Sequence, residues 1–151
     1  MRLWVAQQMR DRLLAAGTDG GRLAQWADDY GQAVPRVVVG YRQPQAAQDW
    51  PFVALLPLAD VQDLLQGYRS ALTMGLVCGV RSAEQDRAGS GAQVALDVLA
   101  DLAIQILADP VSYTAGAAVL VAERAELTAV DLAHPHYQAE QQIHMTSDRG
   151  L

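Results

Sequence analysis

The first part of the chain carries apolar residues at every third or fourth position, which is the spacing of an amphipathic helix. These positions are Leu3, Ala6, Met9, Leu13 and Ala16, followed by Leu23, Trp26, Ala27 and Tyr30. Gly17 supplies a stop for the first helix, and Thr18 with Asp19 offers a cap for the second. Gly31 ends the second helix and Pro35 breaks the pattern. The sequence therefore predicts two short N-terminal helices.

From residue 36 the apolar period changes to two, which is the period of a β-strand. We expect strands at 36–42 and 51–58. Pro57 has no N–H for a ladder hydrogen bond, so it is placed at a sheet edge or a bulge. The third strand, 68–81, alternates most clearly. One face is almost wholly apolar and is assigned to the core: Tyr68, Ser70, Leu72, Met74, Leu76, Cys78 and Val80.

The opposite face of that strand is small and nearly flat, so a helix or another subunit can approach it closely. It consists of Arg69, Ala71, Thr73, Gly75, Val77, Gly79 and Arg81. A charged, Gly- and Ser-containing segment at 82–91 predicts an exposed loop.

The second half of the chain predicts a long helix at 91–109, which Pro110 stops, a turn through 112–116, and two strands at about 117–130 and 137–146. No internal repeat or domain boundary interrupts the 151 residues. The order of elements predicts one α+β domain. In it, a mostly antiparallel sheet packs against one long apolar helix, with the two N-terminal helices beside it.

The 91–109 helix has a single narrow polar stripe and is apolar over the rest of its circumference. The stripe consists of Gln93, Asp97, Asp101, Gln105 and Asp109. An ordinary surface helix has an apolar stripe little wider than ~100°. Two explanations remain open: the domain's own sheet and N-terminal helices cover the surplus, or a neighbouring subunit does. Because large apolar patches are uncommon on monomers, the second explanation predicts an oligomer.

Composition supports burial against partners and argues against nucleic-acid binding. The chain is 51% apolar and 19% charged, compared with ~25% charged residues in typical soluble domains. All 11 basic residues are Arg, a bias that a GC-rich genome also produces, and 17 acidic residues give a net charge of −6. Affinity for duplex DNA depends on phosphate neutralisation, so specific DNA binding is not expected. An acidic channel would instead let DNA slide through without sticking.

Nothing in the sequence points to a membrane or an oxidising compartment. No apolar run approaches the ~20 residues of a membrane span, and no signal peptide is recognisable. The single cysteine, Cys78, has no partner for an internal disulfide. We expect a soluble protein of the cytoplasm.

Candidate catalytic groups are few. Asp97 and Asp101 lie one helical turn apart, as a carboxylate pair for acid–base work would, but such a pair needs a cleft and a partner group. A solvated or Arg-paired stripe explains them more simply. No serine lies in a nucleophile-elbow sequence. Cys78 falls on the buried face of its strand, and Gly89-Ser90-Gly91 lacks the Lys of a phosphate loop.

A metal site would have to be built around His134 and His136, two residues apart beside Pro135. Zinc needs at least a third ligand, for which the candidates are Asp131, Glu140 and His144. The Pro-containing junction is explained more simply as a turn. We therefore expect no metal, no cofactor and no enzyme activity. Trp50, in a loop beside Pro51, is a candidate exposed aromatic anchor for an interface, although packing within the core or loop is the commoner arrangement for such a residue.

The whole layout resembles the lambda U-like phage tail terminator (tail completion) proteins. The segments that carry the resemblance are RVVVGYR (36–42), DWPFVALLPL (49–58), YRSALTMGLVCGVR (68–81), the charged loop, the apolar helix and HYQAEQQIHMTSD (136–148). The resemblance implies a virion protein, assembled in the host cytoplasm, that forms a hexameric ring. The ring would bind the last ring of the tail-tube protein, stop tube growth and present a surface to the head-side connector.

The same resemblance implies that loops 43–50 and 82–91 contact neighbouring subunits or the lumen. The charged candidates there are Arg81, Glu84, Asp86 and Arg87, with Trp50, Asp97 and Asp101 as further contact residues. The alternatives are another neck or connector subunit, an oligomeric adaptor, and a small metal-dependent hydrolase that uses the His134 and His136 region.

Overall fold

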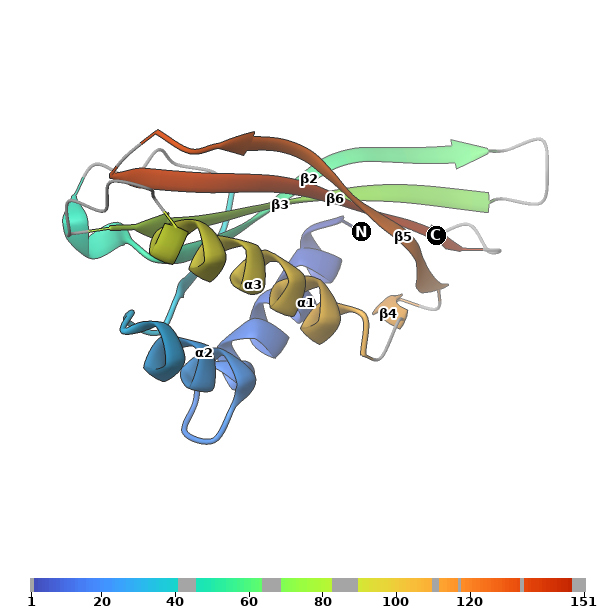
Figure 1. Ribbon diagram of the computed structural model, residues 1–151. Helices are drawn as coiled ribbons and strands as arrows, with labels where there is room; N and C mark the ends of the chain where they lie inside the picture. Colours follow the sequence, from blue (N-terminus) through green and yellow to red (C-terminus); the bar gives the residue numbers. More distant parts are fainter. Residues whose placement is uncertain are drawn as a thin grey trace.

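The computed structural model describes residues 2–40, 46–63, 69–82, 90–109, 112–116, 118–133 and 135–147. It is an α+β arrangement of two layers, with three helices on one face of a curled six-stranded sheet (Figure 1). The elements in chain order are α1 (Arg2–Ala16), α2 (Arg22–Tyr30), β1 (Arg36–Val39), the short 3-10 helix η1 (Ala47–Asp49), β2 (Phe52–Asp63), β3 (Arg69–Arg81), α3 (Ser90–Leu107), β4 (Ser112–Ala115), β5 (Ala118–Asp131) and β6 (His136–Ser147).

The sheet has the strand order β1-β2-β3-β6-β5-β4. β1 pairs parallel with β2, whereas each of the other neighbouring pairs is antiparallel. The sheet is therefore mixed, and the expectation of a mostly antiparallel sheet did not include the parallel pair of β1 and β2. The segment between Val39 and Phe52 is long enough for the crossover that a parallel pair requires.

The central strand β3 places its alternating apolar side chains toward the helices, as predicted. The described members of that face are all buried: Ser70, Leu72, Met74, Leu76, Cys78 and Val80. Tyr68, assigned to the same face, lies outside the described residues. The core continues into β6, whose buried residues alternate with more exposed ones along the whole strand.

α3 is covered by elements of its own chain. It packs on β3 and β6 and contacts α1 and α2 on its other sides. Trp26 of α2 reaches it directly, because its indole Nε1–H donates to the Ala95 carbonyl at 3.0 Å. The exposed positions from Gln93 onward are Gln93, Val94, Asp97, Asp101, Gln105 and Asp109.

The exposed part of α3 is thus the polar stripe plus one valine. α3 is apolar over most of its circumference because its own chain buries it on several sides, which is the first of the two explanations. The other explanation, a neighbouring subunit over α3, is not needed, because the two N-terminal helices cover the side that the sheet leaves open (Figure 1).

Several boundaries differ from the sequence-based expectations. α2 begins at Arg22 with Gly21 as its N-cap, and Thr18 instead donates its hydroxyl back to Ala15 at the end of α1. β2 continues to Asp63, well past the expected end. The segment expected to be a turn contains β4, which is held to α1 because Thr114 N–H donates to the Gln8 side chain at 3.1 Å.

Pro57 lies at an irregularity of β2, as predicted. The register with β3 shifts between Pro57 and Ala59. Upstream, Leu55 accepts a hydrogen bond from Gly40 on the β1 side of the strand. Because hydrogen-bonding directions alternate along a strand, Pro57 has its ring nitrogen on that same outer side, beyond the last residue that β1 covers.

Candidate assembly surface

The two outermost strands of the sheet are much shorter than the strands they cover. β1 pairs only with Phe52–Leu55 of β2, and β4 pairs only with Ala118–Val121 of β5. Across the described ranges, no strand pairs with the outer side of residues 56–63 or of residues 122–131. We call these segments the β2 edge and the β5 edge. Their backbone N–H and C=O groups are open to pairing with another chain.

The uncovered edges also carry exposed apolar side chains. Every residue from 123 to 133 is exposed, although the segment belongs mostly to a strand, so neither face of the β5 edge lies in the core. Leu127 is 59% exposed and Val61 of the β2 edge is 60% exposed. Val130 and Leu58 are the other large apolar side chains of these edges that face solvent. Unburied apolar surface therefore lies along the sheet edges, and also on α1, where Leu3, Trp4 and Leu14 are exposed.

Irregularities interrupt both edges. The β5 edge has two register shifts against β6, between Ala122 and Arg124 and between Leu127 and Ala129. The β2 edge has the shift at Pro57. Bulges and prolines prevent open edges from pairing in arbitrary registers. Both edges are therefore unpaired, but their irregularities restrict the registers in which another strand can pair with them.

An apolar cavity of ≈ 250 Å³ lies beneath the start of the β5 edge. Its walls come from the C-terminal part of α3, including Ile104 and Leu107, and from residues 122–125 of β5, with Ile143 of β6. From this end onward, β5 curves with the sheet away from α3 (Figure 1). The cavity extends the apolar character of the β5 edge toward the helix layer.

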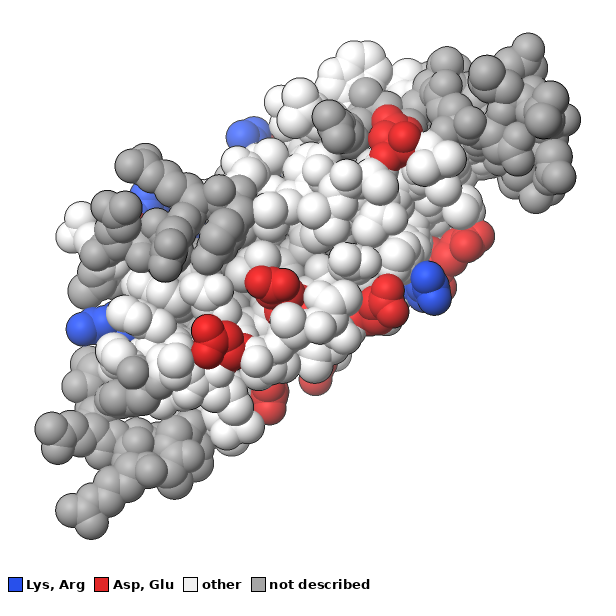
Figure 2. Space-filling model, turned by 90° about the horizontal axis from the view of Figure 1, so that it is seen from above, with Lys and Arg blue, Asp and Glu red and all other residues white. Residues whose placement is uncertain are grey.

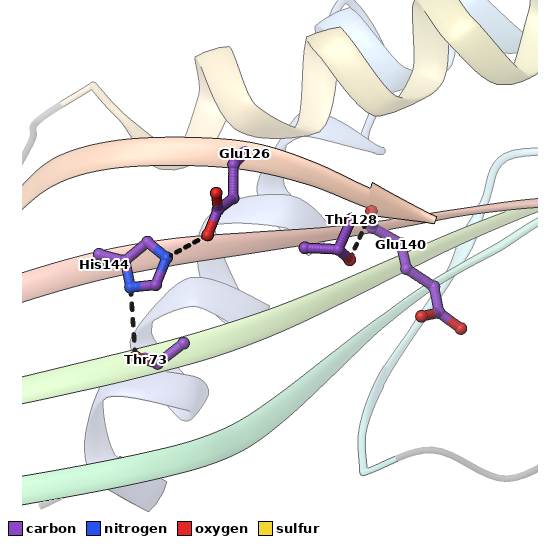
Figure 3. A network of polar contacts seen from close by, with 5 residues as sticks. All are labelled: Thr73, Glu126, Thr128, Glu140 and His144. Atoms are coloured by element: carbon purple, nitrogen blue, oxygen red, sulfur yellow. Dashed lines mark hydrogen bonds and ion pairs between the residues drawn. The ribbon is translucent and has the colours of Figure 1, made fainter. Parts of the chain in front are cut away.

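The face of the sheet opposite the helices carries scattered acidic side chains among uncharged ones (Figure 2). On its β5–β6 half, one polar network ties three strands together (Figure 3). His144 Nε2 lies 2.8 Å from Glu126 Oε1, and His144 Nδ1 lies 3.3 Å from Thr73 Oγ1. Beside it, the Thr128 hydroxyl donates to the Glu140 carbonyl at 3.1 Å.

This network fixes strands and is poorly suited to acid–base chemistry. The hydrogen bond from His144 lowers the pKa of Glu126, the nearby Arg124 charge lowers it further, and partial desolvation opposes both effects. A general base works best with a pKa near the operating pH. A carboxyl group whose pKa is lowered from an already acidic value is a weaker base, so Glu126 serves as a cross-strand partner of His144.

Trp50 packs within its own chain and does not project into solvent. It is only 8% exposed, stacks on His136 with ring centroids 4.8 Å apart, and meets Phe52 edge-on at 4.9 Å. Both rings lie over Gly79, where an added Cβ would come within 2.2 Å of Phe52 and 2.6 Å of Trp50. The flat face of β3 is therefore covered at this end by the chain's own aromatic residues. Of the two arrangements that the sequence left open for Trp50, packing within the chain is the one observed.

The remaining contact residues suggested by the sequence are described only in part. Arg81 is half-buried at the end of β3, whereas Asp97 and Asp101 are exposed on α3. Glu84, Asp86 and Arg87, with the rest of 83–89 and residues 43–45 of the other loop, lie outside the described residues.

Sequence reasoning missed the β5 edge. The available signal was the run Glu123, Arg124, Glu126 within a predicted strand, because these charges fall on both sides of the alternation and leave no apolar face.

The histidines and the cysteine show no shared chemistry. His136 stacks on Trp50 while His144 binds Glu126, and His134 lies outside the described residues. In the part of the chain that the structure describes, no three His, Cys, Asp or Glu residues are grouped closely enough to hold a metal ion. Cys78 is buried, and burial raises the pKa of its thiol to about 12, so the thiol is protonated at neutral pH.

Comparison with protein-family models finds no match, and comparison with curated proteins finds no significantly similar sequence. Among the described helices, none is both long enough and apolar enough to cross a membrane. The functional argument therefore depends on the chain's own geometry.

Proposed function

We propose that this protein is a non-enzymatic assembly subunit that forms a ring of identical copies, similar to a phage tail terminator. In this role the ring caps the tail tube and joins it to the head-side connector in the virion. The observation that supports the proposal is the pair of different unpaired edges on opposite sides of one sheet.

Two different complementary patches on one subunit generate head-to-tail contacts. Such contacts close into a ring when each step includes a suitable rotation, and they form a filament when it does not. Bulges and a proline in the edges favour a defined geometry over open-ended pairing. A closed ring also leaves no edge exposed.

The charge of the chain is compatible with a ring through which DNA passes. The net charge is −6, and acidic side chains are spread over the helix-free face of the sheet (Figure 2). DNA binding depends largely on neutralising phosphates with basic groups. A surface of this kind would not hold DNA in the channel.

Light scattering coupled to gel filtration, followed by negative-stain imaging, tests the proposal. We expect a single species of about six copies, which the images show as a closed ring. A protein that remains monomeric at the highest attainable concentration would overturn it. A ring that fails to attach to the end of tail tubes would instead favour another neck or connector role.

A further inference from the structure

We infer that the β5 edge of one copy pairs antiparallel with the β2 edge of the next copy, so that one continuous sheet runs around the ring. This inference rests on the proposed ring and names the surface that builds it. The occupant of each open edge is therefore a second copy of this chain.

Strand direction supports this pairing. From β2 through β3 and β6 to β5, each neighbouring pair is antiparallel, so β2 and β5 run in opposite directions. A second copy placed beside the first in the same orientation therefore brings its β2 antiparallel to the first copy's β5. No strand needs to turn over, and the helix layers of the two copies stay on the same side.

The two short strands lie at opposite ends of the sheet. At one end of the sheet, the neighbouring residues across β2, β3, β6 and β5 are Phe52, Gly79, Gln138 and Asp131. At this end β1 covers the outer side of β2, while the outer side of β5 is unpaired. At the other end, the neighbouring residues across the same four strands are Val61, Ala71, Thr146 and Val121. There β4 covers the outer side of β5, while the outer side of β2 is unpaired.

Copies that pair through their open segments must therefore be displaced along the strands. β1 of one copy and β4 of the other then lie beyond the two ends of the shared ladder, without collision. A displacement of this kind is what a sheet needs to close on itself.

Counting charges does not separate the possible pairings of edges. The β5 edge carries the carboxylates of Glu123, Glu126 and Asp131 with one arginine, Arg124, and the β2 edge carries Asp60 and Asp63 with no basic residue. Pairing unlike edges is favoured for another reason, because it satisfies both edges of every copy with one kind of contact. Pairing like edges leaves the other edge of each copy open.

Single-cysteine variants test the pairing directly, because the natural Cys78 is buried and unreactive. Ala59→Cys places a thiol on the β2 edge and Ala129→Cys places one on the β5 edge, both at exposed positions. A short bis-maleimide tolerates an uncertain register. We expect covalent dimers only when the two variants are mixed, and a ladder up to the full ring when both changes are in one chain.

Several results would overturn the inference, and they separate it from the proposed ring. Dimers formed by either variant alone show that like edges meet. A ring that light scattering detects but that gives no cross-link in the mixture uses another surface, so the inference fails and the proposed function stands. A protein that stays monomeric would overturn both the inferred pairing and the proposed ring.

Lysine substitutions give a second measurement that does not depend on cross-linking. Val61→Lys and Leu127→Lys place a charge on each edge, and we expect the ring fraction at fixed concentration to fall about tenfold or more. Val94→Lys, at an exposed apolar position of α3, is the matched control and should leave the ring intact. Circular dichroism confirms that each variant is folded. Equal loss of the ring in all three variants would contradict the inference.

Discussion

Gly79 and Gly75 lie on the same face of β3 but have different neighbours. An added Cβ at Gly79 would lie 2.2 Å from the Phe52 ring and 2.6 Å from the Trp50 ring, which meets Phe52 edge-on. At Gly75 the nearest atom is Leu58 Cδ1 at 3.0 Å, the end of an exposed and flexible side chain. The space above the strand is therefore filled at one glycine and adjustable at the other.

We predict that Gly79→Ala destabilises the protein by about 1–3 kcal/mol, because an overpacked site must displace two aromatic rings. Gly75→Ala is the control and should change the free energy of unfolding by less than about 1 kcal/mol, because Leu58 can move into solvent. Urea unfolding followed by tryptophan fluorescence measures both. Equal effects of the two substitutions would show that Trp50 and Phe52 do not pack over Gly79.

The burial of Cys78 makes the free energy of unfolding depend on pH in the alkaline range. Burial raises the pKa of its thiol from 9.0 to about 12, so the stabilisation is complete below pH 9 and is lost as the pH rises toward 12. The maximal slope is about 1.4 kcal/mol per pH unit. Tyr113, whose pKa burial raises from 10.0 to about 12, adds to the loss only above pH 10.

Between pH 9 and pH 10 we therefore expect thermal unfolding of the natural chain to shift to lower temperature, whereas Cys78→Ala shows a flatter profile in the same window. The variant is less stable at every pH because it leaves a small cavity, so the slopes are compared and not the absolute values. Parallel profiles would mean that the thiol is not buried in solution.

At the scale of elements, α3 is the helix whose packing determines the core. Leu99 is fully buried, whereas Val94 on the same helix is 49% exposed. We predict that Leu99→Ala costs about 2–5 kcal/mol, as large-to-small changes in a core do. Val94→Ala should change stability by no more than about 0.5 kcal/mol. Denaturant unfolding of the dilute protein measures both, and a large cost at Val94 would indicate that α3 is covered by something besides its own chain.

The same elements show what periodicity can and cannot predict. The alternation in 68–81 correctly assigned the core face of β3, because one side of a half-buried strand must be apolar. The apolar surplus of 91–109 correctly indicated a helix covered on several sides but could not tell which elements cover it. That depends on where α1 and α2 pack, and no local pattern encodes tertiary position.

The candidate surface was less predictable than the fold. Whether a strand is covered depends on the lengths of its neighbours, and β4 is only four residues long, which is too short for a clear period. The parallel pairing of β1 was missed for a related reason, since strand direction follows from the path of the connection and not from the strand's own residues. The sequence could not decide between an exposed and a packed Trp50, because it does not show that Gly79 leaves room for the ring.

At the scale of the whole molecule, the proposed pairing predicts a specific pattern of hydrogen exchange. Amides in 58–63 and 122–131 lack strand partners on their outer side in a single copy, so many of them should exchange rapidly when the protein is dilute. They should become protected at concentrations where rings form. Amides of β3, which is paired on both sides, serve as the control and should change little. Protection that instead appears on α1 or α3 would place the contact on the helix layer.

The half-covered state of each edge has a consequence for a mixed population of subunits. A version of the chain in which β4 was extended on the N-terminal side of Ser112, to lie along the rest of β5, would be sealed on that side, yet its other side would remain competent. Such a molecule could join a growing arc but could accept no successor. Small amounts of this variant would have a dominant-negative effect, because each copy that is incorporated would leave an incomplete arc in place of a closed ring.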